Sequence, residues 1–375
     1  MLYTPQRLDK VHKAMKREGI DALVIARRAD VHYLTGYEPI SDSLPVGCII
    51  VPEAQPVLIV SDLQERSLEG MKMLAHVRTF SDNGPEESGA VHSSRFWKCV
   101  LDVLKEHNMS ARTIGLQLNW LPVREFEALK SSLPSAGFKD FTDAIWKLRQ
   151  LKDTLEIDAI RKAVKVAEIG IRTALEIVVP GKSGIDASVE IESVMRSAGG
   201  QPRGIRAAVL TGKTSHMPFA QPTAERIQKN DLTIIDITVS HAGYFAELAR
   251  TLHPGSPSRA QRSVFEAALE ASRTMESIMV PGRTLKEITD AVMAKVQERD
   301  SSLMVVPILG SSIGLDLIEP PRISDGSDLP LREGMVFSIH PTVYQPGVGG
   351  ARLADVVVLS ADRCENLTLL SRETM

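Results

Sequence analysis

The chain has 375 residues, 43% of them apolar and 24% charged, and its formal net charge is −3. This length allows two domains with cores of their own, and the near-neutral charge argues against a surface for nucleic acid or for an anionic membrane. The 3 cysteines are scattered without a CxxC pair, and no apolar run approaches the roughly 18–20 residues that span a bilayer. Because the first residues also lack a signal-peptide pattern, we expect a cytoplasmic protein without nucleic-acid or membrane partners.

The first part of the chain alternates between helical and strand patterns. Apolar residues recur at helical spacing from Pro5 to Glu18, and Gly19 follows as a helix stop. The next apolar run, Ala22–Ile25, is typical of a short buried strand. This alternation predicts an α/β unit. The later patterns in this part are strands over 46–51, 57–60 and 113–116 and helices over 95–107 and 123–132.

A polar, charged stretch from Lys147 to Glu156 leads into a long helical pattern that reaches about Ile177. Such a change in composition is typical of a linker between compact units. We therefore place a domain boundary near residue 148, which gives an N-terminal domain over 1–148 and a C-terminal domain over 149–375.

The second half of the chain contains an internal repeat. The segment 179–183 (VPGKS) lies between two helical patterns, and it recurs as 280–284 (VPGRT) between two more. Downstream, the strand pattern over 230–236 matches that over 334–340 at nearly the same offset. A duplicated helix–turn–helix–strand unit predicts a pseudo-two-fold domain with its site at the junction of the halves.

Several motifs resemble those of the family that contains methionine aminopeptidase, prolidase, aminopeptidase P and creatinase. The resemblance implies an α/β (α+β) architecture, with a creatinase-like N-terminal domain and a duplicated C-terminal domain of the pita-bread fold. It covers most of the chain. The motifs that carry it, in family order, are 33–37 (YLTGY), 148–160 (LRQLKDTLEIDAI), 310–321 (GSSIGLDLIEPP) and 334–341 (GMVFSIHP).

Peptidases of this family usually hold two metal ions with five ligands, namely Asp, Asp, His, Glu and Glu. The resemblance maps those positions onto Asp236, Glu247, Ser311, His340 and Ala354. Ser311 and Ala354 lack the imidazole and the carboxylate, and a pair of divalent ions needs a dense set of anionic oxygen ligands. We therefore expect no metal and no other cofactor. A single ion on Asp236, Glu247 and His340 stays open as an alternative.

Creatinase is the family precedent for hydrolysing a carbon–nitrogen bond without metals. The resemblance to creatinase includes Glu247 at the second aspartate position and Arg322 where creatinase binds a substrate carboxylate. His216 lies where creatinase has its acid/base histidine. Creatinase also has a glutamate at the position of His340 and an arginine that aligns with Leu44, and both are missing here. The chain is thus creatinase-like, but creatine is not its expected substrate.

The same residues can be interpreted by their own chemistry. An imidazole titrates near neutrality in general, so the residue type of His216 suits a proton shuttle. Asp236 stands in an apolar strand pattern and needs partners or a raised pKa. The repeat predicts that His340 faces Asp236, and a neighbouring carboxylate would raise the imidazole pKa. Glu247 would orient a water molecule, unless it is paired with Arg250.

Three further residues are candidates for substrate binding. The planar guanidinium of Arg322 would grip a carboxylate, and the aromatic pair Tyr244 and Phe245 precedes Glu247. Arg352 is assigned to the core of its domain instead, and no nucleophile motif such as GxSxG competes with these candidates.

The leading hypothesis is a metal-independent hydrolase of a C–N bond in a small carboxylated amine, an amidine or a dipeptide-like compound. His216 would move the proton, Asp236, Glu247 and His340 would position the water and the scissile group, and Arg322 would hold the carboxylate. One alternative is a metal-dependent Xaa-Pro dipeptidase, aminopeptidase or lyase with an altered single-metal site. Another is a non-catalytic binding module. The resemblance to creatinase also implies a homodimer.

Overall fold

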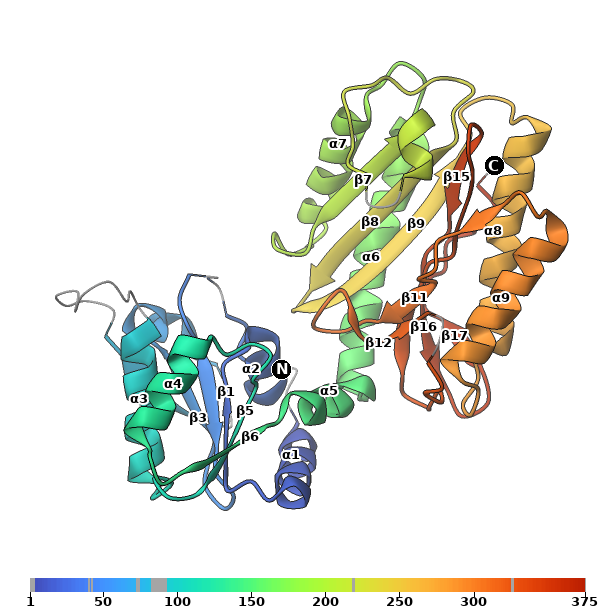
Figure 1. The fold of residues 1–375 in the computed structure, drawn as a ribbon. Helices are drawn as coiled ribbons and strands as arrows, with labels where there is room; N and C mark the ends of the chain where they lie inside the picture. Colours follow the sequence, from blue (N-terminus) through green and yellow to red (C-terminus); the bar gives the residue numbers. More distant parts are fainter. Residues whose placement is uncertain are drawn as a thin grey trace. The chain divides into compact units, whose positions relative to one another are not determined.

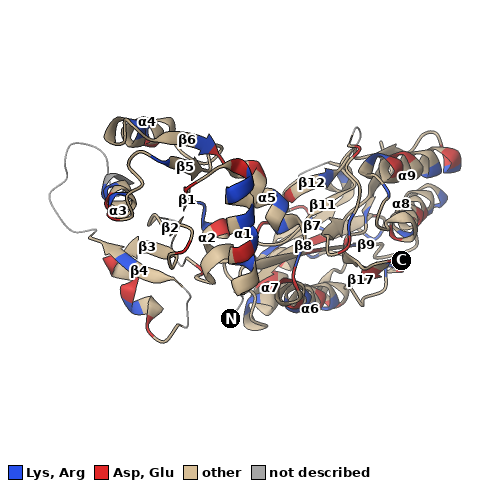
Figure 2. Ribbon diagram, turned by 90° about the horizontal axis from the view of Figure 1, so that it is seen from below, with Lys and Arg blue, Asp and Glu red and all other residues tan. Residues whose placement is uncertain are grey.

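The computed structural model describes residues 4–39, 41, 43–71, 75–81, 93–217, 220–324 and 327–374. The chain divides into two compact units, Met1–Arg149 and Gln150–Met375 (Figure 1). Figure 2 shows acidic and basic residues interspersed along the helices of both units, as the near-neutral net charge predicts. Among the described residues, no helix is long and apolar enough to cross a bilayer.

A mixed sheet forms the centre of the N-terminal unit, and its strands run in the order β4-β3-β2-β1-β5-β6. β1 pairs antiparallel with β2 and parallel with β5. All four residues of β1 are buried, which is typical of a strand covered on both faces. The strands are β1 (Ala22–Ile25), β2 (Gly47–Ile50), β3 (Val57–Ser61), β4 (His76–Phe80), β5 (Thr113–Leu116) and β6 (Gly137–Asp140).

The three helices that the sequence predicts in the N-terminal unit begin and end close to the expected residues. Pro5 opens the first helix, and Gly19, at a φ of 62°, ends it in the left-handed conformation that glycine adopts easily. Phe96 and Val100 of α3 pack against Val24 of the central strand in one apolar cluster. The helices are α1 (Pro5–Glu18), α2 (Arg28–Thr35), η1 (Asp62–Leu68), α3 (Ser93–Glu106), α4 (Val123–Ser132) and α5 (Thr142–Gln150).

The C-terminal unit has two helix pairs that pack on its sheets. α6 packs on β8 and β9, and α8 packs on β14 and β15 (Figure 1). The helical segments are α6 (Thr154–Ile177), α7 (Gly184–Ser197), η2 (Gly212–His216), α8 (Arg259–Ile278) and α9 (Leu285–Arg299). The strands are β7 (Arg206–Thr211), β8 (Thr233–His241), β9 (Tyr244–Leu252), β10 (Met304–Val305), β11 (Gly310–Ser312), β12 (Glu319–Ile323), β13 (Val336–Ile339), β14 (Thr342–Gln345), β15 (Gly349–Arg352), β16 (Asp355–Leu359) and β17 (Cys364–Asn366).

The two helix–turn–helix segments confirm the predicted duplication. Gly181 and Gly282 have φ angles of 92° and 94°, so both VPG turns need the left-handed region. The amide of Gly181 donates to the carbonyl of Ile227 at 2.9 Å, and that of Gly282 donates to the carbonyl of Leu331 at 2.9 Å. Each turn is therefore tied to its own half of the domain in the same way.

The two halves meet where β9 runs beside β16. Ala249 and Ala354 form an isolated bridge in which each amide donates to the other's carbonyl at 3.1 Å. This bridge joins the β7-β8-β9 sheet of the first half to the β12-β11-β13-β16-β17 sheet of the second. The junction therefore brings the side chains of β8 and β9 close to those that follow β13 and β15.

A fully buried arginine reinforces this junction. Arg250 of β9 donates to the carboxylate of Asp355 at 2.8 Å, and both side chains are at most 1% exposed. It also donates to the carbonyl oxygens of Ala354, Leu370 and Ser371, which ties the C-terminal segment to the sheet. Arg250 is therefore committed to Asp355, and the alternative ion pair between Arg250 and Glu247 is not formed.

Replacing Arg250 by Met should destabilise the chain by about 3–5 kcal/mol, because the buried Asp355 carboxylate would keep only its ion pair with Arg372 and the carbonyl oxygens bound by Arg250 would lose their donor. Urea unfolding followed by circular dichroism measures this loss. The matched control is Arg283→Met, since Arg283 pairs with Glu287 at the surface with both side chains at least 50% exposed. The control should cost less than about 1 kcal/mol. Equal losses in the two variants would contradict the assignment of Arg250 to the junction.

Candidate functional site

The guanidinium of Arg352 lies at the centre of a charged cluster at the junction of the halves. Its Nη2 is 2.5 Å from Oε1 of Glu247, and its Nε is 3.3 Å from Oδ2 of Asp236. Its Nη1 donates to Oγ1 of Thr342 at 3.0 Å and lies 3.3 Å from Nδ1 of His340. One arginine therefore contacts three of the predicted catalytic residues, so its assignment to the core of the domain is corrected.

The strand register explains how the two carboxylates come together. Asp236 of β8 is paired with Ala249 of β9, and Thr238 is paired with Glu247. Residues two apart on a strand share a face, so Asp236 and Glu247 are diagonal neighbours on one face of this sheet. From the second half, Arg352 is paired with Thr342 across β14 and β15. Both halves thus contribute to the cluster.

A second set of polar residues extends this face. The hydroxyl of Ser338 donates to Oε2 of Glu247 at 2.7 Å. Ser311 is paired with Ser338 on one side and with Arg322 on the other, so these three side chains share a face. Ser311 is 2% exposed, and within the described part of the chain neither its Oγ nor Oδ1 of Asp236 has a hydrogen-bond partner.

The charges of the cluster shift the pKa of each member. Burial raises the pKa of Asp236, although the neighbouring Arg352 opposes the rise. Burial acts in the same direction on Glu247, but His340, Arg352 and the hydrogen bond from Ser338 lower its pKa to about 2. Glu247 is therefore ionised at neutral pH.

His340 shifts in the direction opposite to the prediction. Burial, followed by the positive charge of Arg352, lowers the pKa of His340 to about 4, and Glu247 only partly offsets this. The expected rise in the pKa from a neighbouring carboxylate is thus corrected, because burial and the charge of Arg352 together outweigh the effect of Glu247. At neutral pH the imidazole is uncharged, so it lacks the imidazolium proton that a general acid would donate.

His216 ends the short helix η2 beside strand β15. The amide of Gly350 donates to Oγ of Ser215 at 3.2 Å, and a Cβ added at Gly350 would lie 2.2 Å from the carbonyl oxygen of Ser215. Gly350 and Arg352 are two apart on β15, so they share a face of the strand. This close approach holds η2, and with it His216, on the side of β15 from which Arg352 extends.

The three predicted substrate-binding residues have different surroundings. Tyr244 is fully buried and its hydroxyl donates to Glu156 of α6 at 3.2 Å, so it has no surface to offer a substrate. Phe245 is partly buried and shares with Glu247 the opposite face of β9. Arg322 is exposed on β12. The prediction for Tyr244 is therefore corrected, while Phe245 and Arg322 stay on the face of the cluster.

The residues at the family's ligand positions do not fit a pair of metal ions in this arrangement. Asp236 and Glu247 offer carboxylate oxygens, but the guanidinium of Arg352 lies against both. Ala354 is fully buried and has no donor atom in its side chain. Within the described ranges, no group of three or more His, Cys, Asp or Glu side chains is arranged to hold a metal ion.

Arg352 is the member of the cluster that the sequence analysis missed. The sequence indicates such a residue only indirectly, because two carboxylates in apolar strand patterns require a cation nearby. Arg352 stands two residues before Ala354, the position at which the family carboxylate is lost. Only the pairing of the strands shows that this arginine, rather than Arg250 or Arg322, meets the two carboxylates.

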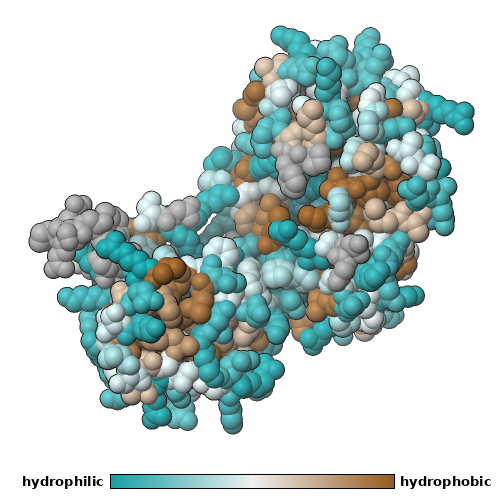
Figure 3. Space-filling model, in the orientation of Figure 1, coloured by the Kyte–Doolittle hydropathy of each residue, from teal (hydrophilic) through white to brown (hydrophobic). Residues whose placement is uncertain are grey.

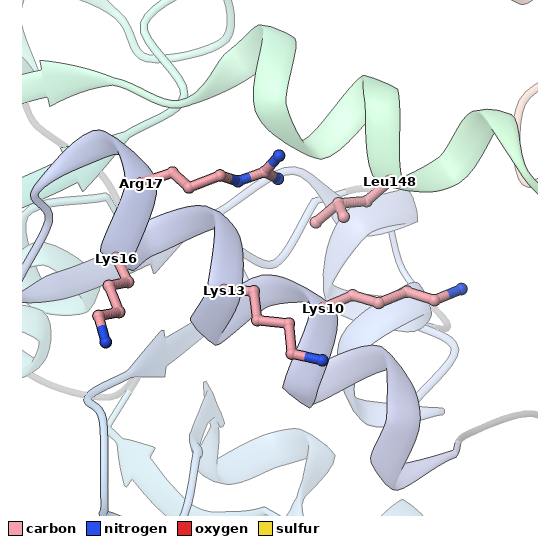
Figure 4. Close-up of a pocket in the computed structure, with 5 residues that line it drawn as sticks. All are labelled: Lys10, Lys13, Lys16, Arg17 and Leu148. Atoms are coloured by element: carbon pink, nitrogen blue, oxygen red, sulfur yellow. The ribbon is translucent and has the colours of Figure 1, made fainter.

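A separate pocket of the N-terminal unit has no comparable chemistry. Figure 4 shows four basic side chains, which extend from α1 in different directions, and Leu148 of α5. All four basic residues are exposed, and the lining contains neither a carboxylate nor a nucleophile. It is a solvated basic surface. The basic residues are Lys10, Lys13, Lys16 and Arg17.

The lowered pKa of His340 predicts how stability depends on pH. The unfolded chain takes up a proton near pH 6.5 and the folded chain only near pH 4, so stability falls as the pH drops through this range. Between pH 7 and 5 this loss amounts to about 1–2 kcal/mol after allowance for partial exposure. Urea unfolding at these two pH values should therefore show a smaller loss for His340→Asn than for the wild type.

The control for this prediction is His76→Asn, because His76 is exposed on β4. This variant should lose as much stability between pH 7 and 5 as the wild type. An unchanged slope in His340→Asn would contradict the lowered pKa. Glu247 acts in a lower window, since its folded-state pKa is about 2 and its contribution is lost as the pH falls from about 4.5 toward that value.

Comparisons with known proteins identify the family. The model of metallopeptidase family M24 matches residues 158–361, and that of the Creatinase/Prolidase N-terminal domain matches residues 7–151. The Xaa-Pro dipeptidase of Pyrococcus furiosus is 29% identical over 374 residues, which cover 99% of each chain. The Xaa-Pro dipeptidase of Pyrococcus horikoshii is 27% identical over 98% of each chain.

Solved structures show the same relationship. The prolidase of Pyrococcus horikoshii OT3 superposes with a TM-score of 0.84 at 25% identity and covers 99% of this chain and 100% of its own. The prolidase of Pyrococcus furiosus superposes with a TM-score of 0.81 at 27% identity and covers 96% of this chain and 99% of its own. These matches confirm the two-domain pita-bread fold.

The comparisons overturn two predictions. The expectation of a metal-independent, creatinase-like hydrolase is wrong, because the matching family is one of metallopeptidases and the relatives are Xaa-Pro dipeptidases. The expectation that the chain uses no metal conflicts with the same family match. The predicted reaction class and family are both confirmed: the chain is a hydrolase of carbon–nitrogen bonds that belongs to metallopeptidase family M24.

Proposed function

We propose that the chain hydrolyses the peptide bond of small dipeptides of the Xaa-Pro type. The observation that carries this proposal is the similarity to Xaa-Pro dipeptidases over 99% of both chains, which includes the N-terminal domain as well as the catalytic one. A shared catalytic domain alone would support only a peptidase of unknown preference. Similarity over both domains also supports the same class of substrate.

Arg322 is suited to bind the substrate's C-terminal carboxylate. It is exposed, and it shares a face with Ser311 and Ser338, of which the second is hydrogen-bonded to Glu247. A guanidinium binds a carboxylate through two parallel hydrogen bonds, which fixes the orientation of the substrate as well as holding it. We propose that Arg322 sets the distance from the carboxylate to the scissile bond, which suits dipeptides better than longer peptides.

Apolar side chains supply a surface for a proline ring. Phe245 shares a face with Glu247, while Met217 and Ile318 are each 50% exposed, one directly after His216 and one directly before β12. Figure 3 shows apolar atoms gathered over the middle of the C-terminal unit. Contact with such residues stabilises an apolar ring, because it removes apolar surface from water.

We propose that His216 gives a proton to the leaving nitrogen. An imidazole can both accept and donate a proton near neutral pH, and His216 is partly exposed at the end of η2. His340 is less suited to this role, because its lowered pKa leaves it as the neutral imidazole rather than the imidazolium at neutral pH. Glu247 is ionised, and its hydrogen bond with Ser338 fixes the position of its negative charge in the site.

The proposal is tested by incubating the purified chain with a panel of Xaa-Pro dipeptides and matched Xaa-Ala dipeptides. Each assay is run with Mn²⁺, Co²⁺ or Zn²⁺ and after treatment with a chelator, and the free proline or free alanine released is measured. We expect release of proline and slower cleavage of the Xaa-Ala series. No hydrolysis of any dipeptide under any of these conditions would contradict the proposal and would favour a peptide-binding role without turnover.

Two substitutions separate the proposed roles. His216→Asn should lower kcat by about 10²–10⁴-fold with little change in KM, as expected for the loss of a general acid. Arg322→Met should raise KM by about tenfold or more, since a hydrogen bond to a charged group contributes about 1.5–3 kcal/mol. Arg363→Met, at an exposed arginine in the turn between β16 and β17, is the control and should leave both constants unchanged.

We also propose that the chain is a cytoplasmic homodimer, as the resemblance to creatinase implies. The free cysteines Cys48, Cys99 and Cys364 support a reducing compartment. Light scattering should give twice the chain mass of 41.0 kDa. A mass of one chain at micromolar concentration would contradict the dimer.

A further inference from the structure

The position of Arg352 bears on how the site takes up a metal ion. Its guanidinium contacts Glu247 at 2.5 Å and Asp236 at 3.3 Å, the two carboxylates that remain from the family's ligand set. We propose that Arg352 is an internal counter-cation that competes with divalent metal ions for these carboxylates. A metal ion then binds the pair only when the side chain of Arg352 moves away.

The argument begins with charge. The carboxylates of Asp236 and Glu247 are 15% and 10% exposed, and they are close enough for each to raise the other's cost of ionisation. A neighbouring cation removes this cost. Arg352 supplies that cation, and its guanidinium cannot lose its proton in a protein. A divalent ion would supply the same compensation, but it would then stand next to a permanent positive charge.

The residues at the other ligand positions determine whether the guanidinium or a divalent metal ion is the better partner for the two carboxylates. His340 and Ala354 stand where the family has two of its four carboxylates, so the cluster holds two carboxylates where the family has four. A guanidinium matches this smaller charge, whereas a pair of divalent ions needs more anionic ligands. His340 adds no negative charge, because an imidazole is either neutral or positive.

The structure also shows how the exchange would take place. The backbone of Arg352 is held by Thr251, whose Oγ1 accepts from the amide of Arg352 at 2.9 Å and donates to its carbonyl at 3.0 Å. The strand is therefore fixed. The side chain is 18% exposed, so it can turn toward solvent by rotation about its own bonds. Its hydrogen bond to Thr342 is the contact that it would give up together with both carboxylates.

Calorimetric titration of the chelator-treated chain with Mn²⁺ tests this inference. Arg352→Ala should bind Mn²⁺ at least tenfold more tightly than the wild type, because the competing cation is gone. The matched control is Arg363→Ala, which removes the same charge from the exposed turn between β16 and β17 and leaves Arg352 on the carboxylates. Its affinity should stay within about threefold of the wild type. Adding Asp236→Asn to Arg352→Ala should abolish the gain.

Equal affinities of the wild type and Arg352→Ala would overturn the inference, as would a gain that survives Asp236→Asn. Arg352→Gln, which keeps a donor for Glu247 and Thr342 without the charge, serves as a second variant and should also bind more tightly. A wild-type Kd below about 1 µM that is lost in Asp236→Asn would overturn the inference without any Arg352 variant. The readout is binding, so the result is independent of whether the chain cleaves dipeptides.

Discussion

Two buried carboxylates on neighbouring strands cannot both stay ionised without a cation, and this constraint shapes the centre of the C-terminal unit. Asp236 and Glu247 share a face of the sheet made by β8 and β9, and Arg352 reaches them from the second half of the duplicated domain. The surrounding groups follow from this contact. Ser338 donates to Glu247, Thr342 accepts from Arg352, and His340 loses its charge beside the guanidinium.

The duplication within the C-terminal domain places the site at the junction of the two halves. Each half supplies a helix pair with a left-handed glycine in its turn and a polar residue in its central strand, and the bridge between Ala249 and Ala354 joins the halves. Arg250 and Asp355 stabilise this junction away from the site, so the two arginines have separate tasks. Arg250 holds the sheets together, and Arg352 balances the charge of the surface on which a substrate would bind.

Family membership indicates a metallopeptidase, whereas the residues at the metal-ligand positions do not fit a pair of metal ions. The chain is similar over its whole length to Xaa-Pro dipeptidases, which decides the reaction class. The ligand positions nevertheless hold Ser311, His340 and Ala354, and an arginine stands against the two carboxylates that remain. A missing ligand is therefore a poor guide to reaction class, because the fold and the substrate surface can persist while the ionic groups change.

The sequence by itself determined the fold class, the duplication, the helices marked by their spacing and end residues, and three members of the charged cluster, Asp236, Glu247 and His340. These features depend on local patterns, such as the apolar period before Gly19 and the two VPG turns. Only the tertiary structure decided that Arg352 meets Asp236 and Glu247, that Tyr244 faces α6, and that His340 is neutral. The reason is that these contacts depend on how distant segments pair and pack, 105 residues apart for Arg352 and Glu247 and 88 for Tyr244 and Glu156, and such pairing leaves no mark in any one segment.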